Sequence, residues 1–440
     1  MKQTAEYREW YKGRFDLFER SLNGEASAEI HSIRKAAIAR FSELGFPTTK
    51  HEEWRFTNVA PIAGREFSPA LEKNNSLTKE QIRPFLFKTP HRLVFVNGQY
   101  SDALSSLGSF PKGVTVSSLS SALRNTPALV TPHLAKYASI EDNAFVALNT
   151  AFVRDGGFVY VPDGIQFDEP LHLLFLSDAG EGMMISPRNL MIVGKRAQLS
   201  IVESYVALTD SNYLVNAVTE VSLDEESTLE HDKLQNDGMK AFHVSAANVR
   251  QKRGSNYVSN TLAMGGALVR NNLTAVLDGE HSECTLNGLT LGTGSQLIDH
   301  HTAIDHATPN CTSHELYKAI LDQKSHGVFN GKIFVRADAQ KTDAKQTNKT
   351  LLLSDEAVID TKPQLEIFAD DVKCTHGATV GQLDEEQVFY LRSRGIDRTH
   401  ARDILTFAFA GDVVNRVHNE SLRGQMEALV NDKLNEGRRN

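Results

Sequence analysis

The sequence predicts a mainly β protein with helical regions at both ends. From about residue 157, short β-type runs such as FVYVPDG, LHLLFLSD and GKIFVRADA follow one another between Gly, Asn and Asp residues. Several runs alternate in polarity, so that Leu273, Ala275 and Leu277 share one face of a strand. Roughly 200 residues of short strands without crossover helices exclude a doubly wound α/β fold and leave a sandwich, a barrel or a strand solenoid. No internal repeat of fixed period decides among the three.

Two helical segments open the chain. In AEIHSIRKAAIARFSELGFP, apolar residues recur at helical spacing from Ile30 to Leu44, and Gly45 supplies a C-terminal stop. The preceding EYREWYKGRFDLFERSL has the same character. The stretch HEEWRFTNVAPI (51–62) has no clear period and indicates connecting chain, whereas HRLVFVNGQYS (91–101) predicts a strand that enters an Asn-Gly turn.

Helices return near the C-terminus. Asp384 is placed as an N-cap, with Gln387 three residues later, and Gly395 stands where a C-terminal glycine belongs. A more apolar helix follows in ARDILTFAFAGDVV, and then the amphipathic SLRGQMEALVNDKLNE. The apolar residues of DILTFAFAGDVV exceed one narrow stripe, which indicates either a helix buried on two sides or one that faces a partner.

Composition excludes several classes of protein. With 440 residues, 40% hydrophobic and 23% charged, the chain resembles an ordinary globular protein, and its net charge of -8 argues against broad binding to nucleic acid. The charged N-terminus carries no secretion signal, no stretch is long enough to span a membrane, and three cysteines are too few for a disulfide framework. We therefore expect a cytoplasmic protein with free thiols.

Motifs for autonomous catalysis are missing from the sequence. It contains no GxxxxGK[ST] nucleotide loop, no GxSxG, no HExxH, no EF-hand loop and no paired CxxC. An ATPase, a serine hydrolase or a structural zinc protein is therefore not expected, and we expect this chain to bind no nucleotide.

Histidines concentrate between residues 281 and 326, in the same region as Cys284 and Cys311. Imidazole and thiolate together suit zinc, copper or iron. Adjacent residues of a strand point to opposite faces, however, so His300 and His301 could hardly share one ion. Burial with hydrogen bonds is the favoured interpretation, and a metal site is the alternative. The histidines of this cluster are His281, His300, His301, His306, His314 and His326.

The stretch FADDVKCTHGATVG (368–381) holds a different kind of candidate. If it is extended, Cys374 and His376 face the same side and could reach one soft metal. Two ligands are too few for zinc or for an iron of a cluster, so the others must come from Asp370 or Asp371, a small ligand or another chain. This deficit suggests a site shared across an interface. On these grounds alone, a turn that closes the β region is the more probable interpretation.

These residues also belong to a longer pattern. Four blocks occur in order between residues 338 and 396: AQKTDAKQ-x-N-x-LLLS, P-x-LEI, ADDVKC-x-HGAT-x-G and FYLRSRGI. Together they resemble the C-terminal half of the SufB/SufD family of iron-sulfur cluster assembly proteins. The likeness extends back through LNGLTLGTGSQLIDHHTAIDHATPNCTSHELYKAIL. HEEWRFTN and the chain length favour the SufD branch over the SufB branch.

The resemblance implies a right-handed parallel β-helix core flanked by N-terminal and C-terminal helical regions. We expect boundaries at 1–155 for the N-terminal region, 156–382 for the β-helix and 383–440 for the C-terminal helices. The resemblance also implies pairing with a SufB-like subunit through the β-helix, docking of a SufC-like ABC-type ATPase on the C-terminal helices, and a possible homodimer in isolation. ATP hydrolysis would then occur in the partner, and this chain would be a non-catalytic scaffold for a nascent iron-sulfur cluster or iron, with a possible part in iron acquisition.

Carried onto this chain, the histidine of the family's C-x-H-G motif is His376, which is thought to hold the nascent cluster together with a cysteine of SufB. Cys374 matches a neighbouring motif cysteine whose role is less defined, and Cys284 and Cys311 match no motif. The alternative is a β-helix carbohydrate-active enzyme that uses Asp370 and Asp371. Adjacent strand residues diverge, whereas such catalysis needs two carboxyl groups facing one sugar at about 5 to 9.5 Å.

Overall fold

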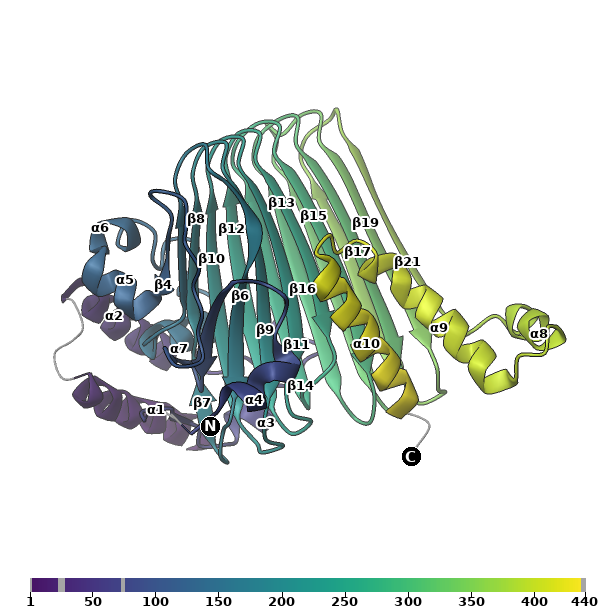
Figure 1. Cartoon of the computed structure of the whole chain (residues 1–440), viewed down its shortest axis with the longest axis horizontal. Coiled ribbons are helices and arrows are strands. Elements are labelled where there is room, and N and C mark those ends of the chain that lie inside the picture. The colour runs from purple at the N-terminus through teal and green to yellow at the C-terminus, as the bar shows by residue number, and fades with distance from the viewer. Residues whose placement is uncertain (1, 23–27, 73–75, 437–440) are drawn as a thin grey trace.

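The computed structural model describes residues 2–22, 28–72 and 76–436, and their elements form a parallel β-solenoid of about seven turns between two helical regions (Figure 1). The predicted mainly β core with helical ends is therefore confirmed, and the solenoid decides among the three architectures that the strand pattern left open. The division into three domains at 155/156 and 382/383 stays a prediction. Among the described helices, none is long and apolar enough to cross a membrane.

Each turn of the solenoid contributes one strand to each of two sheets. The first sheet, in spatial order, consists of β20 (Val358–Ile367), β18 (His326–Val335), β16 (Leu297–His306), β14 (Leu268–Leu277), β12 (Phe242–Gln251), β10 (Leu214–Leu223), β8 (Arg188–Val193), β5 (Gly157–Val161) and β4 (Thr115–Ser118), with β7 (Met183–Ile185) beside β10 and β1 (Ser68–Pro69) beside β7. The second consists of β21 (Lys373–Gly381), β19 (Asp343–Leu352), β17 (Thr312–Leu321), β15 (Glu283–Gly292), β13 (Asn256–Ala263), β11 (Thr228–Asn236), β9 (Gln198–Ala207), β6 (Gln166–Ser177), β2 (His91–Val96) and β3 (Gln99–Tyr100).

The turns of the solenoid differ in length. Strands β10, β12, β14, β16, β18 and β20 begin at residues 214, 242, 268, 297, 326 and 358, so one turn takes between 26 and 32 residues. The variation lies in the connections, because the paired strands themselves stay in unbroken parallel register from β10 to β20. This variation explains why the sequence shows no fixed period.

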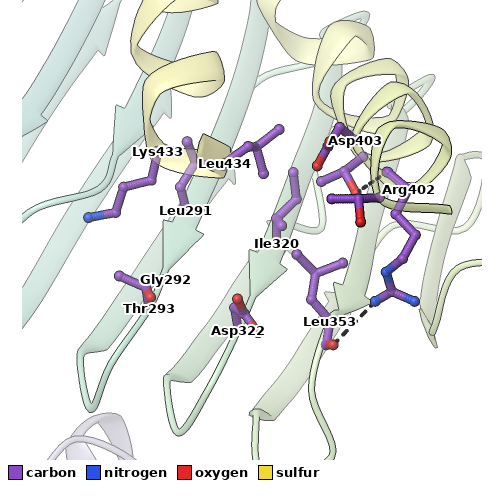
Figure 2. Close-up of a pocket in the computed structure, with 12 residues that line it drawn as sticks. Leu291, Gly292, Thr293, Ile320, Asp322, Leu353, Arg402, Asp403, Lys433 and Leu434 are labelled. Atoms are coloured by element: carbon purple, nitrogen blue, oxygen red, sulfur yellow. Dashed lines mark hydrogen bonds between the residues drawn. The ribbon is translucent and has the colours of Figure 1, made fainter. Parts of the chain in front are cut away.

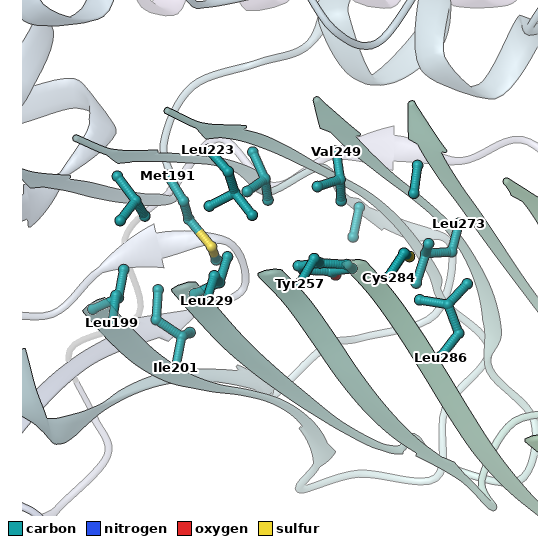
Figure 3. Close-up of a cluster of buried hydrophobic side chains, with 14 of the residues drawn as sticks. Met191, Leu199, Ile201, Leu223, Leu229, Val249, Tyr257, Leu273, Cys284 and Leu286 are labelled. Atoms are coloured by element: carbon teal, nitrogen blue, oxygen red, sulfur yellow. The ribbon is translucent and has the colours of Figure 1, made fainter. Parts of the chain in front are cut away.

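Inward-facing side chains fill the space between the two sheets. They are mainly aliphatic in the N-terminal turns, as Figure 3 shows, and the predicted alternation holds because Leu273, Ala275 and Leu277 all lie in this core. The side chains labelled in that view are Met191, Leu199, Ile201, Leu223, Leu229, Val249, Tyr257, Leu273, Cys284 and Leu286.

The N-terminal helices cover the outer face of the first sheet. They include α1 (Lys2–Ser21), α2 (Ala28–Leu44) and α7 (Ala144–Ala151), whose aromatic residues pack with Phe242 and Val244 of β12. Gly45 has a left-handed backbone (φ +65°), as expected of a residue that ends a helix. Shorter helices follow: α3 (Ala60–Ala63), α4 (Lys79–Ile82), α5 (Leu119–Asn125) and α6 (Pro127–Val130), with single 3-10 turns at Glu52–Trp54 and Arg83–Phe85.

The C-terminal helices α8 (Glu385–Ser393), α9 (Arg398–Val414) and α10 (Glu420–Glu436) follow the last strand. Asp384 is the N-cap of α8 and accepts a hydrogen bond from the backbone N–H of Glu386, as predicted. Helices α9 and α10 lie over the outer face of the second sheet, while α8 projects beyond the end of the solenoid (Figure 1). The apolar residues of α9 are therefore used partly within the chain, by packing on the sheet and on α10.

Candidate functional site

The predicted pair Cys374 and His376 lies on β21, the last strand of the second sheet. β21 pairs with β19 on one side, Cys374 opposite Ala344 and His376 opposite Gln346. On its other side, it has no neighbouring strand among the described residues. The segment is therefore an edge strand, and the interpretation of Cys-x-His-Gly as a turn is wrong.

Both residues occupy inward-facing positions of the last turn. The register places Cys374 in line with Ala344, Ser313 and Cys284, all of which are buried in the solenoid. His376 nevertheless is exposed and Cys374 half-buried, because no further turn closes the solenoid above them. The candidate site is thus the open cross-section of the β-helix interior.

The thiol of Cys374 lies at the edge of the apolar core. It is free, and its partial burial raises its pKa above the ordinary value, opposed by a hydrogen bond with the backbone of Ala344. A thiol with a raised pKa is largely protonated at neutral pH, so it becomes a good metal ligand only when a cation binds and displaces the proton. This arrangement favours Cys374 as a secondary ligand to a centre formed by other groups.

Asp371 does not complete the site. Its carboxylate forms an ion pair with Lys341, and its backbone N–H donates to Gln340 in the adjacent connection. It therefore supplies no free carboxylate to Cys374 or His376. The same pairing argues against Asp370 and Asp371 as facing catalytic carboxylates. Among the described residues, no group of three or more His, Cys, Asp or Glu side chains could hold a metal ion.

Apolar side chains are exposed around the open end. Phe368 is 61% and Val380 48% exposed, and Val358 and Ile367 of β20 are also exposed. β20 and β21 are the terminal strands of the two sheets, so their outer backbone groups are left without a strand partner in the described structure. An exposed edge with apolar side chains is a template for pairing with another chain.

The histidine cluster is dispersed, as the alternation of strand residues predicted. His300 lies inside the solenoid, whereas His301 lies on the outer face between Asp299 and Glu53. His306 bonds to Ser313 (2.9 Å) and His326 to Asp360 (2.7 Å). Cys284 and Cys311 are buried, and burial raises the pKa of each thiol.

Sequence reasoning missed the role of HEEWRFTN. This connecting segment fastens the N-terminal region to the solenoid: Arg270 of β14 lies 3.8 Å from the Trp54 ring centroid and donates to the Glu53 carbonyl oxygen (2.6 Å). Thr57 donates to the buried carboxylate of Asp299, which also accepts from Arg270. The contacts join residues more than 200 positions apart, so the local sequence carries no signal for them.

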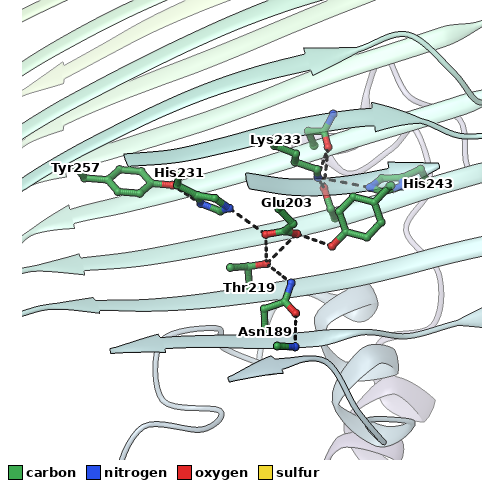
Figure 4. Close-up of polar contacts among 11 residues, drawn as sticks. Asn189, Glu203, Thr219, His231, Lys233, His243 and Tyr257 are labelled. Atoms are coloured by element: carbon green, nitrogen blue, oxygen red, sulfur yellow. Dashed lines mark hydrogen bonds and ion pairs between the residues drawn. The ribbon is translucent and has the colours of Figure 1, made fainter. Parts of the chain in front are cut away.

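A polar network inside the solenoid was also missed. Figure 4 shows Glu203 of β9 accepting hydrogen bonds from Thr219 and bonding to His231 (2.9 Å), which in turn contacts the Tyr257 hydroxyl (3.0 Å). Lys233 lies in the same interior, and burial lowers its pKa to about 8. Single inward-facing polar residues in separate strands look unremarkable in sequence, and only the stacking of turns brings them together.

The helical layer is fastened to the second sheet at defined points. The largely buried Lys318 of β17 donates to the Phe409 carbonyl oxygen of α9 (2.8 Å) and pairs with Asp412. A cavity of about 240 Å³ lies between this layer and the strand ends. Figure 2 shows residues that line it, among them Arg402, which contacts the Leu353 carbonyl oxygen (3.5 Å). Beyond the layer, Phe389 and Tyr390 of α8 are 70% and 57% exposed.

The geometry defines a β-solenoid protein that presents a thiol and an imidazole on an open sheet edge, with an exposed helical appendage beside it. Comparison with known families agrees with this class. Residues 175–409 match the family model described as SUF system FeS cluster assembly, SufBD core domain, and residues 1–173 match the SufBD protein N-terminal region. The chain therefore belongs to the SufBD family, and the resemblance seen in its motifs is confirmed.

Relatives extend over nearly the whole chain. The chain is 33% identical to an iron-sulfur cluster assembly SufBD family protein of Synechocystis over 423 residues, covering 93% of this chain and 92% of the relative. It is 31% identical to the iron-sulfur cluster assembly protein SufD of Escherichia coli over 412 residues (91% and 92%) and 25% identical to SufD of Bacillus subtilis over 419 residues (92% and 94%). A role in iron-sulfur cluster assembly within the Suf system follows.

Proposed function

We propose that this chain is a non-catalytic scaffold subunit of a SufBCD-type complex in the cytoplasm. The observation that carries the proposal is the open end of the solenoid, where the inward-facing His376 and Cys374 remain accessible on an unpaired edge strand. A SufB-like subunit would cover this end and pair with β20 and β21. The ligands that the site lacks would then come from the partner, and a nascent iron-sulfur cluster, or iron on its way into one, is the cargo held between the two chains.

The proposal assigns different roles to the two residues. His376 is the primary ligand, because an exposed imidazole can bind iron without prior loss of buried contacts. Cys374 is secondary because its thiol is half-buried against the core and its pKa is raised. A second copy of the chain could occupy the same edge in isolation, which gives the expected homodimer.

A SufC-like ATPase would bind the C-terminal helices and supply the ATP hydrolysis that this chain lacks. The exposed aromatic residues Phe389 and Tyr390 of α8 favour this position, since large apolar side chains that are exposed together commonly mark protein interfaces. Because α9 is fixed to β17 through Lys318, a movement of the helical layer would be transmitted to the solenoid.

Replacement of the imidazole tests the proposal. In cells that depend on this complex, His376→Ala should lower the activity of an iron-sulfur enzyme roughly tenfold or more, which is typical of the loss of a metal ligand or its support. Recovery of the SufB-like and SufC-like chains by affinity purification should stay unchanged. His314→Ala is the matched control, because His314 is an exposed histidine of the same sheet that faces outward on β17. Normal enzyme activity with His376→Ala would contradict the proposed site.

A further inference from the structure

The interior directly behind His376 contains a pair of polar residues. In the register of the second sheet, His376 of β21 lies opposite Gln346 of β19, and Gln346 lies opposite Glu315 of β17. Neighbouring strands of a sheet are about 4.8 Å apart, so inward-facing side chains of adjacent turns are within reach of one another. The three residues form one row that runs from the open end into the solenoid.

The two inner members of the row are bonded to each other. The Gln346 side-chain N–H donates to one carboxylate oxygen of Glu315 at 2.6 Å, and both residues are buried. In the structure the amide nitrogen faces Glu315 and the carbonyl oxygen Oε1 is turned away from it. Burial raises the pKa of Glu315 to about 7, so the carboxylate form, which can only accept, holds this orientation above that pH. That oxygen is buried and has no hydrogen-bond partner among the described residues. A buried acceptor without a partner costs about 1–3 kcal/mol, so a hydrogen bond from a donor that reaches this oxygen is favourable.

The opposite sheet holds the amide in place. A Cβ atom added to Gly331 of β18 would lie 2.3 Å from the Gln346 side-chain nitrogen and 2.6 Å from Cζ of Phe329. Only glycine leaves room for the amide here, and the amide in turn has little freedom to rotate. The Gln346 side chain is thus confined from two directions, by Glu315 within its own sheet and by the backbone of Gly331 across the interior.

We propose that Gln346 is a positioning residue for His376: its free carbonyl oxygen accepts a hydrogen bond from one imidazole N–H, and Glu315 fixes the amide in the orientation that this requires. The inference rests on the proposed role of His376 and adds an inner layer to that site. An imidazole that donates one N–H to a fixed oxygen is held in a single tautomer, and its other nitrogen presents a lone pair. In this chain, that nitrogen would face the open end, where the iron-sulfur cargo is expected.

The tautomer of His376 provides a direct test on the isolated full chain. Protein labelled with ¹⁵N-histidine gives a pattern of ring nitrogen shifts for each histidine, and the signals of His376 are those lost in His376→Ala. We expect one tautomer in the unsubstituted protein and the mixture of a free imidazole in Gln346→Leu. In cells, Gln346→Leu should lower the activity of a cluster-dependent enzyme roughly tenfold. Glu315→Met, which keeps the length of the side chain and removes the acceptor that orients the amide, should shift the tautomer in the same direction and serves if Gln346→Leu does not fold.

Asn348→Leu is the matched control. Asn348 is a buried amide on the same face of β19, but its register partner in β21 is Ala378. The tautomer of His376 should not change in this variant. If Gln346→Leu leaves the tautomer unchanged, or if both leucine variants impair the enzyme equally without a change in tautomer, the positioning role is overturned. That outcome is separate from failure of the proposed function, which His376→Ala alone decides.

Discussion

The buried ion pair between Glu220 of β10 and Arg188 of β8 is expected to hold the N-terminal region on the solenoid. Both side chains are almost fully buried, at 0% and 1% exposure. The Glu220 carboxylate accepts two bonds from Arg188 (3.0 and 2.6 Å) and one each from the backbone N–H groups of Ala135, Tyr137 and Ala138 (2.8 to 3.0 Å). One side chain thus satisfies five donors and compensates a buried cation.

Glu220→Gln conserves the shape of this side chain and removes its charge. The amide offers one acceptor oxygen in place of two and brings two donors of its own, so at least two of the five donors lose their acceptor. At about 1–3 kcal/mol for each such donor, and with the Arg188 charge left uncompensated, the free energy of unfolding should fall by about 3–5 kcal/mol. Arg188→Met together with Glu220→Leu removes both charges but leaves the backbone N–H groups of Ala135, Tyr137 and Ala138 without their acceptor, so it should not recover the loss.

Urea-induced unfolding measured by tryptophan fluorescence suits this prediction. The two tryptophans of the chain, Trp10 and Trp54, both belong to the N-terminal region, so their emission reports on the part that the ion pair fastens. Circular dichroism follows the strands of the solenoid in the same samples. The difference between the two transitions shows whether the N-terminal region separates first.

An exposed pair provides the control. Lys195 and Glu225 form an ion pair at 3.0 Å, with exposures of 41% and 47%, in connections of the same turns. Glu225→Gln should leave the free energy of unfolding nearly unchanged, since solvent screens such pairs. If Glu220→Gln is as mild as Glu225→Gln, the argument from burial is refuted.

Two further predictions concern pH and docking. Burial raises the pKa of Asp232 to about 8 from its ordinary value of 3.8, opposed by a hydrogen bond from Asn260. The folded chain therefore keeps a proton that the unfolded chain releases, and the stability contributed by this proton is lost as pH rises between these two values. Asp232→Asn should therefore stabilise the protein by about 2–5 kcal/mol at pH 8 and flatten the pH dependence of the melting temperature; an unchanged slope would contradict the assignment. Phe389→Ser should reduce recovery of the ATPase at least tenfold in affinity purification while the SufB-like chain is retained, because a 70% exposed aromatic residue contributes to an interface and little to the fold. Equal recovery of the ATPase would place its docking surface elsewhere.

Much of the local structure could be predicted from residue patterns. The helices that begin and end the chain follow from apolar spacing together with Gly45 and Asp384, and the strands follow from alternation, as at Leu273 and Leu277. These signals are local: each depends on residues within a few positions of one another, and the structure confirms all of them.

The stacking of turns could not be predicted in the same way. Turns of 26 to 32 residues hide the period, because the insertions fall in connections that the sheets tolerate. The anchor formed by Arg270, Trp54 and Asp299 likewise joins segments far apart in sequence. Such contacts depend on which strands are neighbours in the folded chain. Local patterns in a single sequence do not show which strands become neighbours.

The sequence by itself determined that helical regions flank a β region, which family the chain belongs to, and that Cys374 and His376 are candidate site residues. The tertiary structure decided that this pair lies on inward-facing positions of the last turn and is exposed only because the solenoid ends there. It also decided that Gln346 and Glu315 stand behind His376 in one row. The reason is physical: alternation along a strand fixes which residues share a face, but the order of the turns determines which faces are closed, which remain open and which side chains meet across them.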